Sequence, residues 1–82
     1  MSMKARLTKW KSNNPIKLFR KENGLSQQDL AAMIGVSTYT LQRWEGGTVS
    51  PTNGNLDILN EIIEGIEGKL QDWKSERPSY ND

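Results

Sequence analysis

The sequence predicts an all-α fold, built as a compact bundle of four to five helices, and three observations lead to this class. A capping residue followed by apolar residues at helical spacing occurs twice within residues 25–45. An apolar stripe with heptad-like spacing runs from residue 56 to residue 73. Glycine or proline separates successive apolar segments, as expected between helices. The 82 residues are enough for one such domain and too few for two.

The first predicted helix covers residues 15–22. Asn14 is a favoured capping residue, and Pro15 suits the first helical position because the N–H that proline lacks is not needed there. Apolar side chains within this segment can enter a core, and Asn23-Gly24 ends the helix.

Two further helices are predicted over residues 26–34 and 37–45. Ser26 with Asp29 three positions later has the spacing of a capping box, and Ser37 caps the next helix. Each cap lies inside the spacing of a hydrophobic staple, formed by Leu25 with Leu30 and by Val36 with Leu41. Gly35 lies between the helices and permits a positive φ, so that the second helix can leave the first at a steep angle. The segment is therefore expected to be a helix-turn-helix.

The rear third of the chain carries the apolar stripe. Its members recur every three or four residues and are Leu56, Leu59, Ile63, Ile66, Leu70 and Trp73. Gly65 and Gly68 each cost about 1 kcal/mol relative to alanine inside a helix. A bend at these glycines would divide the segment into two helices. Residues 76–82, with Pro78, are expected to form a disordered tail.

The composition argues against catalysis. The chain has no cysteine and no histidine, which removes the usual nucleophile–base pairs and the commonest metal ligands. The acidic residues are scattered, so no paired-carboxylate site is apparent. We therefore expect no enzyme activity, no metal or other cofactor, and no small-molecule substrate. No apolar run approaches the roughly 20 residues needed to cross a membrane, and the expected location is the cytoplasm, in association with the nucleoid.

The charges divide unevenly along the chain. Residues 1–50 carry eight Lys/Arg and three Asp/Glu, which gives +5, whereas residues 51–82 carry three and seven, which gives −4. This asymmetry suits a protein that meets a polyanion with one end. Residues 1–14 form a basic N-terminal segment, in which Lys4, Arg6, Lys9 and Lys11 are either an arm along DNA or a solvated face.

The string LSQQDLAAMIGVSTYTLQRWEGGTVSP, residues 25–51, resembles the phage repressor and Cro-type helix-turn-helix family. Its matching features are a cap with Gln at the start of one helix, Ala-Ala in the middle, Gly at the turn and a Trp-Glu-x-Gly end. The resemblance implies a lambda repressor-like domain over residues 15–64 that binds double-stranded DNA as a two-fold homodimer. Residues 65–75 then extend the last helix and either form the dimer seam or pack back on Leu7 and Trp10.

The third helix carries the predicted base-reading residues. Leu41 and Trp44 are three positions apart and are assigned to the core, so Thr38, Tyr39, Gln42 and Arg43 lie on the other side. The major groove presents a distinct hydrogen-bonding pattern for each base pair, and Arg43 can bind guanine while Gln42 can bind adenine. The alternative is that these residues form an ordinary solvated helix face.

Other positions are assigned to the DNA backbone or to structure. The resemblance implies a phosphate contact at Gln27, where free N–H groups of a helix start attract anions, and Ser37, Lys17 and Thr48 are further phosphate candidates. The resemblance also implies that Arg20 pairs with Glu45 for a structural purpose.

The leading hypothesis is a sequence-specific transcriptional regulator, a repressor that binds a near-palindromic operator as a dimer with residues 37–45 in the major groove. A DNA-binding antitoxin and a restriction–modification controller are alternatives of the same class. A protein-interaction module that keeps the fold without binding DNA is the alternative from another class.

Overall fold

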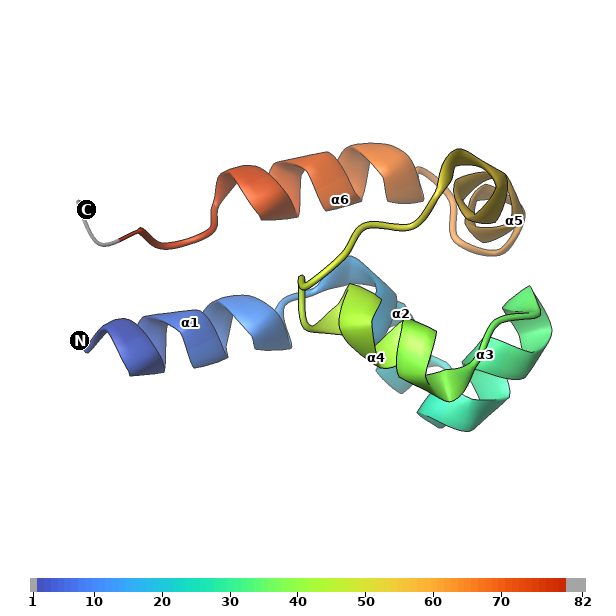
Figure 1. Cartoon of the computed structure of the whole chain (residues 1–82), viewed down its shortest axis with the longest axis horizontal. Coiled ribbons are helices and arrows are strands. Elements are labelled where there is room, and N and C mark those ends of the chain that lie inside the picture. The colour runs from blue at the N-terminus through green and yellow to red at the C-terminus, as the bar shows by residue number, and fades with distance from the viewer. Residues whose placement is uncertain (1, 80–82) are drawn as a thin grey trace.

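The computed structural model describes residues 2–79, and within that range the chain forms six α-helices (Figure 1). Their bounds are α1 Met3–Ser12, α2 Pro15–Glu22, α3 Gln27–Ile34, α4 Thr38–Glu45, α5 Asn53–Ile62 and α6 Ile66–Ser75. The all-α class is confirmed, but the expected count of four to five helices is too low. The additional helix is α1, which occupies the segment expected to be a basic arm.

The local capping signals explain where α2, α3 and α4 begin. The Asn14 side chain accepts hydrogen bonds from the first N–H groups of α2. Ser26 and Asp29 form a complete capping box at α3, and the Ser37 hydroxyl accepts from the Thr40 N–H at α4. Each side chain satisfies donors that a helix start leaves without internal partners. Gly35 follows α3 with φ +86°, the left-handed conformation that a turn between two steeply crossing helices requires.

The long apolar segment divides at Gly65, as the bend hypothesis expected. Gly65 has φ +70° and Ile63 is extended, so the chain turns between α5 and α6, whereas Gly68 lies inside α6. The apolar stripe faces the interior of this same chain. Leu59 and Ile66 are 0% exposed, and Leu70 is 4% exposed. Ile63 and Trp73 are buried as well, and Leu56 is half-buried, so the stripe contributes to the core of this chain. Whether residues 65–75 take part in a dimer stays a prediction.

The first and last helices lie side by side and run in opposite directions (Figure 1). The rings of Trp10 in α1 and Trp73 in α6 stack with centroids 3.9 Å apart and planes 1° apart. Each indole N–H donates a 2.7 Å hydrogen bond to the main-chain carbonyl of the other tryptophan. Each of these carbonyls also accepts a main-chain hydrogen bond at its own helix end, from Asn13 at 3.1 Å for Trp10 and from Glu76 at 3.2 Å for Trp73. We call this reciprocal pair the tryptophan clasp.

The clasp also explains a glycine two residues after the end of α4. Gly47 has φ +75°, and a Cβ placed there would lie 2.8 Å from Cη2 of Trp10 and 3.0 Å from Cη2 of Trp73. Only glycine therefore fits this position without moving the rings.

The chain continues beyond α6 without further helix up to residue 79. The Arg77 guanidinium lies over the Trp10 ring, 5.2 Å from its centroid. The last part of the segment expected to be a disordered tail, residues 80–82, lies outside the described residues. None of the helices within residues 2–79 combines the length and the apolar character that a membrane crossing requires.

Candidate nucleic-acid interface

The helix α4 has one buried side and one outward side. Leu41 is 0% exposed and Trp44 is 3% exposed, and both belong to the main core cluster. On the other side, Tyr39 is 66% exposed and the Arg43 guanidinium lies over its ring, 5.4 Å from the centroid. Gln42 is exposed and Thr38 is half-buried beside them. The structure thus brings the four predicted base-reading residues to one outward edge of a short helix.

The ends of α4 are held by hydrogen bonds close to this edge. The Ser37 hydroxyl accepts from the Thr40 N–H at 3.0 Å and donates its proton to the Thr40 hydroxyl at 2.9 Å. The hydroxyl of Ser37 is thus engaged in capping, and its phosphate contact stays a prediction. Thr48 is exposed just after α4, and its N–H donates to the carbonyl of Arg43 at 3.0 Å.

A buried ion pair joins α2 to the end of α4. Arg20 donates from Nε to Glu45 Oε2 at 2.8 Å and from Nη2 to Glu45 Oε1 at 3.1 Å. Its third contact is from Nη1 to the carbonyl of Leu25 at 3.1 Å. The side chains of Arg20 and Glu45 are 12% and 5% exposed. The hydrogen bond with Glu45 raises the pKa of Arg20 above its ordinary value, although burial opposes this rise. Arg20 and Glu45 therefore have the structural contact that the resemblance implied.

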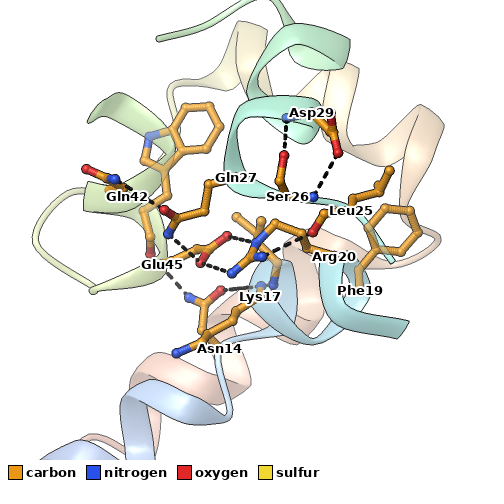
Figure 2. A network of polar contacts seen from close by, with 12 residues as sticks. Asn14, Lys17, Phe19, Arg20, Leu25, Ser26, Gln27, Asp29, Gln42 and Glu45 are labelled. Atoms are coloured by element: carbon orange, nitrogen blue, oxygen red, sulfur yellow. Dashed lines mark hydrogen bonds and ion pairs between the residues drawn. The ribbon is translucent and has the colours of Figure 1, made fainter. Parts of the chain in front are cut away.

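Gln27, the predicted phosphate contact, is half-buried at the first position of α3. Figure 2 shows its side-chain amide between Glu45 and Gln42. Its Nε2 donates to Glu45 Oε1 at 3.2 Å, and its Oε1 accepts from Gln42 Nε2 at 3.2 Å. Sequence reasoning missed both contacts because they join residues on different helices. Whether Gln27 also contacts phosphate stays a prediction.

Asn14 makes a second link between α2 and α4 (Figure 2). The side chain is 0% exposed; its Oδ1 accepts from the N–H groups of Ile16 and Lys17, and its Nδ2 donates to the carbonyl of Trp44 at 3.2 Å. The sequence indicated the cap but gave no signal for the contact 30 positions away. Lys17, a candidate phosphate contact, is half-buried at this helix start.

This arrangement can place a rigid set of donors and acceptors against a grooved surface. An α-helix such as α4 is about 10–12 Å across with its side chains, which fits the major groove of B-DNA, about 12 Å wide. Arginine, glutamine, threonine and tyrosine side chains supply hydrogen bonds and apolar contacts to base edges and phosphates. The buried contacts of Glu45 and Trp44 restrain the helix at its far end.

Comparison with known proteins agrees with this geometry. The sequence model of a helix-turn-helix family matches residues 16–64, which is more than half of the chain. Antitoxin HipB of Escherichia coli strain K12 is 33% identical over 54 residues, covering 66% of this chain and 58% of that protein. Antitoxin HipB of Escherichia coli O6:H1 is 33% identical over 54 residues, covering 66% of this chain and 54% of that protein.

The match thus spans little more than half the length of these relatives. No solved structure matches the chain significantly. The family match covers the helices that present and support the outward edge of α4, and it agrees with the resemblance carried by residues 25–51. The chain belongs to the helix-turn-helix family of DNA-binding domains, of the phage repressor and Cro type.

Proposed function

We propose that this protein is a sequence-specific transcriptional regulator that inserts α4 into the major groove of double-stranded DNA. It acts as a repressor and binds a near-palindromic operator as a homodimer. The observation that carries the proposal is the outward edge of α4. Tyr39 is 66% exposed while Leu41, two positions later, is 0% exposed, so a polar edge projects from a helix that the core holds in place.

The proposed base-reading residues are Thr38, Tyr39, Gln42 and Arg43. Arg43 has the donor geometry to bind O6 and N7 of guanine with two hydrogen bonds. The contact of its guanidinium with the Tyr39 ring, 5.4 Å from the centroid, favours a position of Arg43 beside Tyr39 on this edge. Thr38 and Tyr39 supply apolar contact for a thymine methyl group or a hydroxyl for phosphate.

The proposed phosphate contacts lie around this edge and are Gln27, Ser37, Lys17 and Thr48. The N-terminal 50 residues carry a charge of +5, which suits approach to a polyanion. Phosphate contacts fix the register of a protein on DNA and make its affinity dependent on salt. We therefore propose that these contacts fix the register of the protein on DNA, and that α4 selects the base sequence.

A dimer would place two copies of α4 about 34 Å apart, one turn of DNA, on an operator with two-fold symmetry. The apolar stripe of α6 is buried in the core of one chain, so the proposed dimer seam uses a different surface. Symmetry in the selected DNA sequences, together with sedimentation of the free protein, would test this part.

The experiment is selection of bound sequences from a random DNA pool, followed by affinity measurements on the winning site. Arg43→Ala should weaken binding by about 5- to 150-fold, since one base contact contributes about 1–3 kcal/mol. Lys69→Ala, which removes the same charge from an exposed position of α6, is the matched control. The proposal fails if no sequence is enriched, or if Arg43→Ala binds the selected site as tightly as the unaltered protein.

Salt dependence separates the two kinds of contact. Lys17→Ala should weaken binding to all sequences alike and reduce the slope of log affinity against log salt by about 1. Arg43→Ala should alter sequence preference as well as affinity. An unchanged slope for Lys17→Ala would remove Lys17 from the phosphate contacts and leave the assignment of α4 intact.

A second candidate function is that of an antitoxin. It is favoured by the similarity to the two proteins named antitoxin HipB, which covers 66% of this chain. An antitoxin must bind and neutralise a toxin, whereas a pure operator-binding repressor has no such partner. Coexpression with the product of the adjacent gene distinguishes the two functions. If that product stops cell growth and this chain restores it, the antitoxin function is supported. If this chain has no effect on growth, only the regulator function remains.

A further inference from the structure

A chain of four side chains runs from α2 through α3 to the outward edge of α4 (Figure 2). It begins with the Arg20–Glu45 ion pair, in which Glu45 Oε2 accepts at 2.8 Å. Glu45 Oε1 also accepts from Gln27 Nε2 at 3.2 Å, and Gln27 Oε1 accepts from Gln42 Nε2 at 3.2 Å. Three helices are thus linked by side-chain hydrogen bonds to one exposed glutamine.

The chemistry of the chain permits only one direction for each amide. The ionised Glu45 carboxylate, which Arg20 keeps paired, can only accept hydrogen bonds. Gln27 must therefore point its NH₂ group at Glu45 and its carbonyl oxygen at Gln42. That oxygen accepts but cannot donate, so Gln42 must turn its own NH₂ group inward. A flip of either amide would bring two acceptor oxygens together at about 3.2 Å, the N···O distance now observed in both contacts.

The consequence appears at the exposed end. Gln42 is exposed, and its Oε1 has no hydrogen-bond partner among residues 2–79. An unrestrained glutamine can turn either its oxygen or its NH₂ group toward a base, so it can bind base edges that donate hydrogen bonds as well as base edges that accept them. Here the oxygen faces outward, with the remaining hydrogen of Nε2 beside it.

We propose that Glu45, acting through Gln27, fixes the side-chain amide of Gln42 with its oxygen outward and thereby restricts the base that Gln42 reads to adenine or cytosine. These two bases present an exocyclic amino group in the major groove, at N6 and N4, whereas guanine and thymine present O6 and O4. Adenine fits best, because its N7 can also accept the remaining hydrogen of Nε2. Gln27 is then a positioning residue. The inference rests on the proposed function, since it concerns what α4 reads.

The first test begins by locating the operator position that Gln42 contacts, which is the position where Gln42→Ala abolishes base preference. The preference of the unaltered protein is then measured at that position. The unaltered protein should favour adenine or cytosine there over guanine or thymine by about 5- to 150-fold. Gln27→Met keeps the side-chain length and a similar helix propensity but cannot hydrogen-bond as an amide does, and it should reduce this preference at least about 5-fold. Gln28→Met, at the neighbouring exposed position of α3, is the matched control and should leave it unchanged.

The outcomes separate this inference from the proposed function. Three results would overturn the inference: a preference for guanine or thymine, an unchanged preference in Gln27→Met, or the lack of any position that depends on Gln42. In each of these cases, enrichment of a sequence from the DNA pool would still support the proposed function. A protein that enriches no sequence overturns the proposed function and the inference together.

A second test needs no DNA. Gln42→Glu places a carboxylate against the fixed oxygen of Gln27, so it should lower the melting temperature more in the unaltered protein than in the Gln27→Met background. The substitution adds the same negative charge near Glu45 in both backgrounds. The difference between the two changes in melting temperature therefore reports the contact with Gln27. Equal shifts in the two backgrounds would overturn the fixed amide. In NMR spectra, the side-chain NH₂ signals of Gln42 should also move in Gln27→Met and stay in place in Gln28→Met.

Discussion

Replacement of Gly47 by alanine tests how firmly the tryptophan clasp is packed. The residue has φ +75°, and its new Cβ would lie 2.8 Å from Trp10 and 3.0 Å from Trp73. Left-handed backbone costs about 1–2 kcal/mol for a residue with a Cβ. The rings are stacked and hydrogen-bonded to each other, so they cannot retreat freely, and overpacking costs about 1–3 kcal/mol more. Gly47→Ala should therefore lower the free energy of unfolding by about 2–5 kcal/mol.

Thermal melting followed by circular dichroism is the assay, with two glycines as controls. For a chain of this size the loss corresponds to a fall in Tm of at least about 8 °C. Gly65→Ala isolates the backbone cost, because Gly65 has φ +70° and no neighbour within 4 Å of a Cβ. Gly68→Ala lies inside α6 in open space and should stabilise the protein by about 0.5–1 kcal/mol.

The reasoning would be refuted if Gly47→Ala melted at the same temperature as Gly65→Ala, since the rings would then impose no steric cost. A further check replaces one ring. In a Trp10→Leu background, which removes the nearest ring, the steric part should shrink, so that Gly47→Ala costs less there than in the unaltered protein.

Two further predictions concern the ion pair and the capping box. Arg20→Met leaves Glu45 buried without its cation and should cost about 3–5 kcal/mol in urea unfolding; a loss below about 1 kcal/mol, typical of surface pairs, would contradict this. The pKa of Asp29 is lowered mainly by a hydrogen bond from the main-chain N–H of Ser26 and, to a smaller extent, by the Ser26 side chain. The stability that Asp29 contributes is thus complete above its unfolded pKa of about 3.9 and is lost as pH falls through the lower folded pKa. Melting temperatures measured from about pH 6 down to about pH 2 should fall less steeply for Asp29→Asn, and equal slopes would exclude this contribution.

Local patterns allowed the central helices to be predicted from the sequence. The capping box at Ser26, the cap at Ser37 and the glycine at 35 each act over a few residues, so their effect can be recognised without knowing the fold. The outward direction of Tyr39 followed in the same way, because Leu41 and Trp44 define the buried side of a short helix.

Contacts between distant segments could not be predicted in this way. The spacing of Leu70 and Trp73 fits an internal core and a dimer seam equally well, and only the position of α1 decides between them. The helix α1 has no acidic residue in its first turn and a single buried residue, Trp10, so its sequence resembles a basic arm. The contacts of Gln27 with Glu45 and Gln42 depend on how three helices meet, which periodicity does not specify.

The tryptophan clasp has a consequence for the order in which the chain folds. Its hydrogen bonds join residues 63 positions apart, so forming it closes a loop that contains most of the 82 residues. The entropy lost in closing such a loop is greater than that for α3 and α4, which are neighbours in sequence and need only a short turn. The helix-turn-helix formed by α3 and α4 can thus assemble first, and the contact between α1 and α6 can open while it persists. Hydrogen exchange should then be faster at the two indole N–H groups than at the main-chain amides in the middle of α3.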